Sequence, residues 1–326
     1  MKPVLSLCIP TEGIVEWVLP VLDSIFSQNC DANMYEVVVC DNGINDNLAE
    51  KIRPYLVKHR NLSYYRSSAK LFLNQIEAFE HCNGELIKFI NSRCRCLEGT
   101  VQYLIETANK YRNTRPIIYF LEGFNGNNST ISISTFNEFF KSLGKYTTYS
   151  GGIACWREDM EYIRSRHELI RYYFPHLVYY TTFTKRSLYI VDNTRLTQEI
   201  PIKLTAKSGY NIFEAIALEF PAILLDLLDN HDIDLETFKY LKSELEDHVV
   251  ETYVRYLIKN WDTSLTFENK EALLDTFFGF EYIKHKATKQ VLDERKKDTI
   301  IKIKQTIKQL LGIKSFRHTI KGGAVK

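Results

Sequence analysis

Three features are scarce or missing in this chain of 326 residues: an excess of charge, a long apolar run and a regular set of cysteines. Lys and Arg number 42 and Asp and Glu number 40, which excludes a surface coated with nucleic-acid-binding charge. No window approaches 18 continuous apolar residues, so no transmembrane helix is expected. The apolar run that Pro10 ends is too short for the core of a signal peptide.

The seven cysteines follow no even, regularly spaced framework, which indicates reduced thiols in a cytoplasmic protein. Cys94 and Cys96 are one residue apart, but no second Cys/His pair at a suitable spacing accompanies them. The cysteines therefore predict neither a disulfide scaffold nor a zinc site.

The chain does have an ordinary globular composition, with 45% hydrophobic and 25% charged residues, and its strand and helix patterns alternate. This order predicts an α/β fold with a mostly parallel sheet and helices on both faces. Strands are expected at 4–9, 36–40, 62–65, 85–90 and 116–121, helices at 14–27, 48–59, 71–82 and 99–111, a loop at 122–134, and mainly helix from 232 to about 290.

Polar residues follow three of the expected strands, where such sheets bind ligands beyond the carboxyl ends of their strands. An Asp41 carboxylate at a strand end can accept hydrogen bonds from ribose hydroxyls or a pyrimidine N–H. The alternative is that Asp41 only shapes the turn of an Asp-Asn-Gly sequence. The three strand ends are Pro10-Thr11-Glu12, Asp41-Asn42-Gly43 and Asn91-Ser92-Arg93.

Two of these segments carry a resemblance. Leu5-Ser6-Leu7-Cys8-Ile9-Pro10-Thr11, followed by Glu36-Val37-Val38-Val39-Cys40-Asp41-Asn42-Gly43, resembles the opening of family 2 glycosyltransferases, nearest to the abequosyltransferase-like branch. Residues 84–90 and Gly99 extend the likeness, whose specific part covers about residues 3–105. A weaker likeness continues through 149–152 and 207–211. The resemblance implies the GT-A fold.

The resemblance also implies a nucleotide-sugar donor and an inverting single displacement. It places Pro10, Thr11 and Glu12 along the nucleotide pocket, lets Asp41 accept a hydrogen bond from the base or ribose, and has Asp46 and Asn74 shape the same pocket. Asn74 has the alternative of being a surface amide on a helix. Further donor-binding residues are expected at Asn42, Asn91, Ser92 and Arg95.

The sequence departs from the family at its metal motif. Family members carry Asp-x-Asp, whose carboxylates hold Mg²⁺ or Mn²⁺ against the donor diphosphate, where this chain has Asn91-Ser92-Arg93. Asn is a poor ligand for a hard cation and Arg93 repels one, so no metal cofactor is expected. Arg93 or Arg95 can instead pair with phosphate oxygens and stabilise the leaving group. The alternatives are loss of transfer activity and a solvated loop charge.

An inverting transfer needs a general base, which family members usually supply as a downstream carboxylate. The corresponding stretch here, 172–177, has no acid, and His176 is the predicted base because its intrinsic pKa lies near neutrality. The alternative is a histidine packed beside aromatic residues. Weaker carboxylate candidates are Glu158, Asp159 and Asp192. The aromatic residues of 172–180 are either an acceptor platform or core.

The last 28 residues, 299–326, contain seven basic residues and no acid, which leaves a formal charge of −5 for the first 298 residues. Apolar residues recur there at helical spacing. A basic amphipathic helix of this kind binds an anionic membrane surface. The alternatives are a helix docked on the domain and a frayed terminus. The apolar positions are Ile300, Ile303, Ile307, Leu310 and Leu311.

The sequence thus predicts a GT-A domain at 1–230, with a nucleotide-binding half at 1–115 and an acceptor half at 116–230, a helical extension at 231–298 and the basic tail at 299–326. The predicted function is metal-independent transfer of a sugar from a nucleotide sugar to a glycan or lipid-linked glycan of a bacterial capsule or O-antigen. The alternative is an inactive relative that binds nucleotide or glycan, or scaffolds a partner enzyme. The expected location is the cytoplasm, peripheral to the inner face of the plasma membrane.

Overall fold

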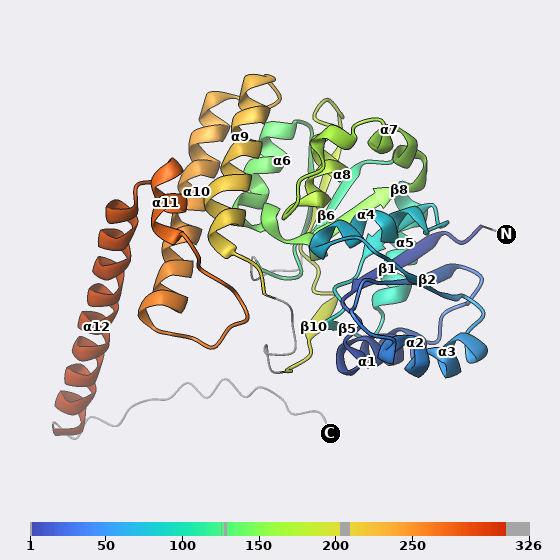
Figure 1. Ribbon diagram of the computed structural model, residues 1–326, viewed down its shortest axis with the longest axis horizontal. Helices are drawn as coiled ribbons and strands as arrows, with labels where there is room; N and C mark the ends of the chain where they lie inside the picture. Colours follow the sequence, from blue (N-terminus) through green and yellow to red (C-terminus); the bar gives the residue numbers. More distant parts are fainter. Residues whose placement is uncertain (1, 125, 127–128, 203–208, 311–326) are drawn as a thin grey trace.

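A central β-sheet with helices on both faces forms most of the molecule, and a helical C-terminal part packs against one side of it (Figure 1). The structure is a computed structural model that describes residues 2–124, 126, 129–202 and 209–310. The predicted fold class, α/β with a mostly parallel sheet and a helical C-terminal extension, is confirmed.

The large sheet has eight strands in the order β3-β2-β1-β4-β8-β6-β9-β7, and β10 and β5 form a separate antiparallel pair. Only β8 and β7 run against the other strands of the large sheet. The strands are β1 (Leu5–Thr11), β2 (Tyr35–Asp41), β3 (Leu62–Arg66), β4 (Leu86–Phe89), β5 (Cys94–Cys96), β6 (Ile117–Phe120), β7 (Thr130–Ile133), β8 (Ile153–Trp156), β9 (Tyr189–Asp192) and β10 (Thr197–Glu199).

The α-helices are α1 (Val15–Phe26), α2 (Asn47–Lys51), α3 (Arg53–Lys58), α4 (Asn74–Glu80), α5 (Thr100–Tyr111), α6 (Phe136–Leu143), α7 (Met160–Arg164), α8 (Val178–Thr181), α9 (Phe220–Asp229), α10 (Leu235–Tyr253), α11 (Lys270–Phe277) and α12 (Phe280–Leu310). Two π-helical stretches are η8 (Glu214–Glu219) and η9 (Val254–Ile258). Short 3₁₀ turns are η1 (Leu71–Leu73), η2 (Gly144–Thr148), η3 (Ser150–Gly152), η4 (Arg157–Asp159), η5 (His167–Leu169) and η6 (Pro175–Leu177).

Successive side chains of the central strands point alternately into two hydrophobic cores, one on each face of the sheet. Leu7 of β1 faces the core beneath α1 and α5, whereas its neighbour Cys8 faces the core beneath α4, α6 and α8. Residues of β1 and β2 are buried almost throughout because both faces of a parallel sheet are covered. The second core continues into the C-terminal helices through Leu241, Leu245 and Val249 of α10. The predicted helical extension therefore shares a core with the second half of the sheet.

Three local expectations need correction. The loop expected at 122–134 contains β7, an edge strand whose polar and apolar residues pair with β9. The single helix expected at 48–59 is two short helices, because Pro54 begins a new helix at its first turn. The helix expected at 71–82 begins with the 3₁₀ turn η1 and is α-helical only from Asn74.

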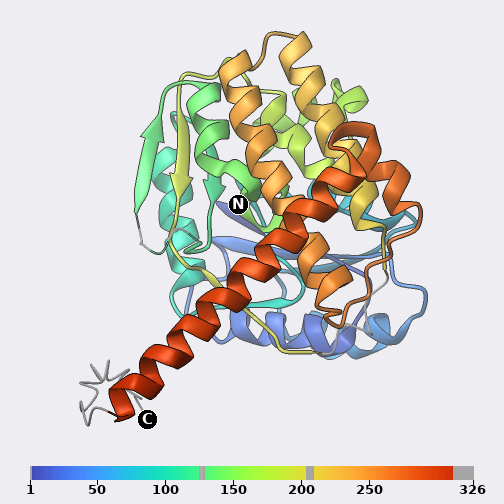
Figure 2. The same ribbon diagram turned by 90° about the vertical axis from the view of Figure 1, so that its left-hand side faces the viewer.

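Helix α12 packs on the body with its first half and projects away from it with its second half (Figure 2). Ile283, Ala287 and Val291, which lie on one helix face, are buried, whereas every described side chain from Arg295 to Lys304 is exposed. In the described ranges, no helix combines the length and apolar character needed to span a bilayer. Residues 311–326 of the predicted tail lie outside the described residues.

The two halves of α12 predict different effects of the same substitution. Ile283→Ala, in the buried half, is expected to lower the free energy of unfolding by about 2–4 kcal/mol because it leaves a cavity. Ile303→Ala, in the projecting half, is the matched control and is expected to change it by less than about 0.5 kcal/mol. Urea denaturation of both variants measures this, and equal losses would contradict the projecting arrangement.

Candidate functional site

A cleft lies at the carboxyl edge of the sheet, and three hollows that share lining residues form it. The inner pocket lies between the ends of β1 and β4 and includes Pro10, Thr11 and Ser92. The outer hollow lies beside the start of α1 and the loop after β2. The aromatic pocket, of about 230 Å³, lies between Tyr149, Tyr173 and α10. The inner and aromatic pockets share Phe72, Gln75, Asn91, Arg93 and Ser150, whereas the inner pocket and outer hollow share Glu12, Asn42 and Leu71.

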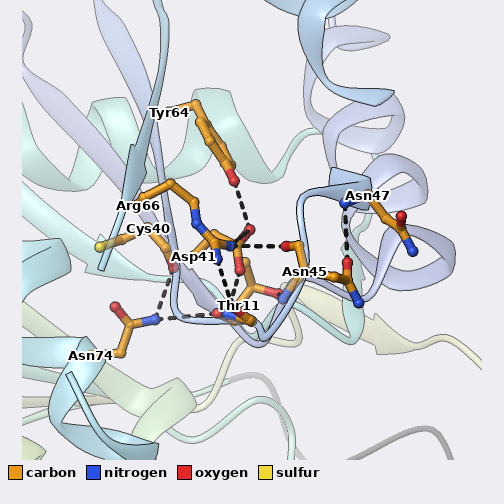
Figure 3. A network of polar contacts seen from close by, with 10 residues as sticks. Thr11, Cys40, Asp41, Asn45, Asn47, Tyr64, Arg66 and Asn74 are labelled. Carbon is orange, nitrogen blue, oxygen red and sulfur yellow. Dashed lines mark hydrogen bonds and ion pairs between the residues drawn. The ribbon is translucent and has the colours of Figure 1, made fainter. Parts of the chain in front are cut away.

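A buried carboxylate organises the nucleotide side of the cleft (Figure 3). The register of the sheet aligns Thr11, Asp41 and Arg66 at the ends of β1, β2 and β3. Asp41 is fully buried, and its Oδ2 accepts hydrogen bonds from the Tyr64 hydroxyl at 2.6 Å and from Arg66 at 2.7 Å, the latter an ion pair. Burial, and then the Asp41 carboxylate, raise the pKa of Tyr64. The hydroxyl therefore stays a donor.

The same ion pair fixes the loop after β2. Asp41 Oδ1 accepts the Gly43 N–H at 2.7 Å, and Arg66 donates to the carbonyls of Gly43 and Asn45 at 2.7 and 3.2 Å (Figure 3). A Cβ at position 43 would lie 2.4 Å from the Glu12 carbonyl oxygen, so the close approach of the two loops requires glycine. The hydrogen-bond partners of Asp41 described above are protein groups, which gives it a positioning role. Its predicted contact with the nucleotide stays a prediction.

Asn74 ties two strand ends together and presents its oxygen to the inner pocket. Its Nδ2 donates to the carbonyls of Thr11 at 3.3 Å and Cys40 at 2.9 Å, so it is buried rather than the surface amide of the alternative interpretation. Asn42 donates to the carbonyls of Ala69 and Leu71, and so closes the wall between the inner pocket and the outer hollow.

Four buried polar atoms that line the inner or aromatic pocket have no protein hydrogen-bond partner. They come from three elements, α1, α4 and η6, and four other atoms of the described side chains share this condition elsewhere. Three are acceptors and the indole is a donor, which is the pattern that sugar hydroxyls satisfy. The four atoms are Trp17 Nε1, Asn74 Oδ1, Gln75 Oε1 and His176 Nδ1.

Arg93 is the cation at the junction of the two pockets. The Asn91 side chain accepts the Arg93 N–H at 3.0 Å, which shapes the turn after β4, and the guanidinium lies over the Trp17 ring at 5.6 Å. The guanidinium forms a long ion pair with the Glu199 carboxylate, at 3.9 Å. Arg95 lies away from the cleft: it bonds Gln198 of β10 at 2.9 Å and lines a separate hollow.

The turn after β4 has poor ligands for a divalent cation, because Asn91, Ser92 and Arg93 offer no carboxylate and Arg93 adds a positive charge. The expected absence of a metal cofactor stays a prediction. Within the described ranges, no three His, Cys, Asp or Glu side chains are grouped so as to hold a metal ion.

His176 is a neutral, fully buried imidazole in the aromatic pocket. Its Nε2 lies 3.2 Å from the Thr147 carbonyl oxygen, which can only accept, so Nε2 carries the proton and Nδ1 presents a lone pair. Burial lowers the pKa of His176 to about 4. His248 of α10 lines the same pocket, and burial lowers its pKa also to about 4. Sequence analysis missed His248, which only the packing of α10 brings to the cleft.

Several predicted residues lie away from the three hollows. Asp46 is exposed at the start of α2, while its neighbours Asn45 and Asn47 line the outer hollow. The weaker base candidates bond other protein groups: Glu158 pairs with Arg115, Asp159 with Arg186, and Asp192 accepts the Tyr103 hydroxyl.

Beneath the cleft lies Lys88 of β4, a buried cation that sequence analysis missed. Its ammonium group donates to the carbonyls of Phe89, at 2.8 Å, and Gly151, and lies 5.0 Å from the centre of the Phe120 ring. Burial lowers its pKa to about 8. Lys88 thus fastens η3, which carries Ser150, to β4, the strand that precedes Asn91.

Comparisons with known proteins agree with this geometry. A model of the family described as Glycosyl transferase family 2 matches residues 6–162, slightly less than half of the chain. No curated protein sequence matches it. The crystal structure of S. aureus TarS 1-349 in complex with UDP has a TM-score of 0.52 at 15% identity, over 80% of this chain and 76% of that chain. The TarS complex with UDP-GlcNAc has a TM-score of 0.51 at 15% identity, over 78% and 73%. Similarity at this level shows a shared fold.

The depressed pKa of His176 predicts a pH-dependent stability. In the unfolded chain His176 has a pKa near 6.5, whereas in the folded chain its pKa is about 4. The unfolded state therefore binds more protons between these pH values, and the free energy of unfolding falls as the pH drops through this window. From pH 7 to pH 5, His176 is expected to account for a loss of about 2 kcal/mol in the free energy of unfolding. Urea denaturation of the unmodified chain and of His176→Gln at both pH values measures this: the variant is expected to lose about 2 kcal/mol less of its free energy of unfolding between pH 7 and pH 5. An equal loss in both proteins would contradict the prediction.

Proposed function

We propose that this chain is a family 2 glycosyltransferase, which moves a sugar from a nucleotide sugar to a growing bacterial surface polysaccharide, capsule or O-antigen, as an abequosyltransferase-like enzyme. The observation that carries the proposal is the set of four unpartnered polar atoms in the inner and aromatic pockets. The donor lies in the outer hollow and inner pocket, and the acceptor in the aromatic pocket. UDP sugars are the first donors to test, because TarS structures of the same fold contain UDP and UDP-GlcNAc.

The reaction is an inverting single displacement without a metal ion. The acceptor hydroxyl oxygen attacks the anomeric carbon, the bond from that carbon to the diphosphate oxygen breaks, and its electron pair leaves with the diphosphate. Arg93, at the junction of both pockets, stabilises the charge that develops there.

His176 Nδ1 takes the proton of the acceptor hydroxyl. The lone pair is available because Nε2 carries the ring proton. A pKa of about 4 makes the free imidazole a weak base, but the negative diphosphate of a bound donor stabilises the imidazolium and raises the pKa toward neutrality.

The second candidate function is a catalytically silent protein that binds nucleotide or glycan, or scaffolds a partner enzyme. One observation favours it: among the described residues, no carboxylate lines the aromatic pocket. Donor binding without any glycan extension would distinguish this function from the first.

Arg93 and Arg95 form a matched pair for testing the chemistry. Arg93→Ala is expected to lower kcat by about 10²–10³-fold because it removes the leaving-group cation. Arg95→Ala is expected to leave kcat unchanged because its guanidinium lies outside the cleft. Transfer is measured with a panel of nucleotide sugars in excess EDTA; loss of activity on adding the chelator would contradict the metal-free mechanism.

The projecting half of α12 and the basic tail are proposed to rest on an anionic membrane and to bring the cleft to a lipid-linked acceptor. Ile300, Ile301 and Ile303 are about half exposed there, and the chain carries seven basic residues after Asp298. The −5 charge of the first 298 residues keeps the rest of the surface from competing for the same lipids.

Truncation tests the membrane contact. The full chain is expected to co-sediment with phosphatidylglycerol vesicles at least about tenfold more strongly than with phosphatidylcholine vesicles, and a chain ending at Asp298 is expected to lose this difference. Equal binding of both chains would contradict the proposal. The affinity for UDP, measured on both, controls for folding.

A further inference from the structure

A second cavity, of about 210 Å³, lies outside the cleft between η5, η6 and α9. Leu169, Leu177, Ile223 and Leu227 form its apolar floor. We call it the side cavity. Its volume is about seven times that of a water molecule in the liquid, which is room for a single sugar ring.

The rim of the side cavity carries hydrogen-bonding groups of both charges. Arg171 forms an ion pair with Asp226, and Arg166 pairs with Glu168 at 2.7 Å. Asp232 accepts the Thr184 hydroxyl at 2.6 Å, and Asn230 adds an amide to the rim. Two cations face two carboxylates there, so the rim favours a neutral ligand over an ion.

An apolar floor with donors and acceptors around it matches one class of ligand. A pyranose ring has a C–H face that packs on apolar side chains, and its edge carries hydroxyls that donate to carboxylates and accept from guanidinium and amide groups. A lipid chain would take the paired charged groups of the rim out of water without offering them a hydrogen bond, and a phosphate would face two carboxylates.

One short segment connects the side cavity to the cleft. Arg171 lines the side cavity, Tyr172 lines the outer hollow, and Tyr173, Phe174 and His176 line the aromatic pocket. The three cavities are therefore reached from consecutive residues, about 3.8 Å apart along the backbone.

A single carboxylate holds this segment in place. Glu219 accepts the backbone N–H groups of Tyr172, Tyr173 and Phe174 at 3.2, 2.7 and 3.1 Å. Asp226, which pairs with Arg171, lies seven residues further along the same helical stretch. A ligand that engages Arg171 thus acts on the segment that positions the wall of the aromatic pocket.

We infer that the side cavity is a second carbohydrate site, which holds a neutral sugar residue of the acceptor glycan while another residue of that glycan occupies the aromatic pocket. The inference rests on the proposed function for the identity of the glycan as acceptor. The binding itself does not require transfer activity.

Hydrogen–deuterium exchange with UDP at saturation tests the binding. The probes are methyl glycosides of glucose, galactose and N-acetylglucosamine, added to the full chain. At least one glycoside is expected to protect residues 177–181 and 223–230, and Asn230→Trp, at the exposed rim, is expected to abolish this protection. Asp229→Trp, at an exposed neighbour that does not line the cavity, is the matched control. Protection of the cleft alone, no protection by any glycoside, or equal effects of both variants would overturn the inference.

A second pair of variants distinguishes the loss of a rim group from a folding defect. Arg166→Ala removes a rim donor, whereas Arg164→Ala removes a guanidinium that pairs with Glu80 outside the cavity. With an oligosaccharide acceptor, Arg166→Ala is expected to raise KM about tenfold with kcat unchanged, as the loss of one or two hydrogen bonds would. Arg164→Ala is expected to leave KM unchanged, and the reverse result overturns the inference. If the unmodified chain transfers no sugar, the proposed function fails while the exchange experiment still decides the binding.

Discussion

The burial of the Asp41 carboxylate is the constraint on which the nucleotide side of the cleft depends. A charge removed from water must be paired and hydrogen-bonded, and the Arg66 guanidinium, the Tyr64 hydroxyl and the Gly43 N–H meet this need from three directions. Two of the donors come from β3 and the third from the loop after β2, so the carboxylate aligns the ends of β2 and β3 with the loop between β2 and α2. Gly13 and Gly43 carry no side chain because any Cβ would collide with this cluster.

The sequence was sufficient for the parts of the fold that local pattern decides. Buried β-branched runs identified β1 and β2, and the carboxyl-edge rule placed Thr11 and Asn91 in the cleft. Strand β7 was missed because its alternation is only four residues long, Thr-Ile-Ser-Ile, and stands in a stretch rich in Gly, Asn, Ser and Thr, which indicates a loop. Arg66 was open to prediction by the same edge rule, as the last residue of β3. His248 was not, because α10 reaches the cleft only through long-range packing.

Electrostatics in the cleft follow from how few charges line its acceptor side. The aromatic pocket has neutral imidazoles, and burial raises the pKa of Tyr210 to about 12, so its phenol also stays neutral. Arg93 is the cation that both pockets share. In the proposed reaction, a single guanidinium between uncharged aromatic walls attracts the leaving phosphate more strongly than it would in water, because the dielectric constant of such walls is lower. The replacement of the acidic motif by Asn91-Ser92-Arg93 and the neutral walls of the aromatic pocket thus support the same proposal, a leaving group stabilised by Arg93 without a metal ion.

The orientation of α12 decides between the alternatives for its apolar face. At 3.6 residues per turn, Ile300 and Ile303 lie roughly 120–180° around the helix from Val291, the last buried residue of the packed face. A straight helix that docks through Ile283, Ala287 and Val291 therefore turns its later isoleucines away from the body. Docking of this second apolar face on the same domain would require the helix to break. The exposed isoleucines with Lys residues beside them are the arrangement on which the proposed contact with an anionic membrane depends.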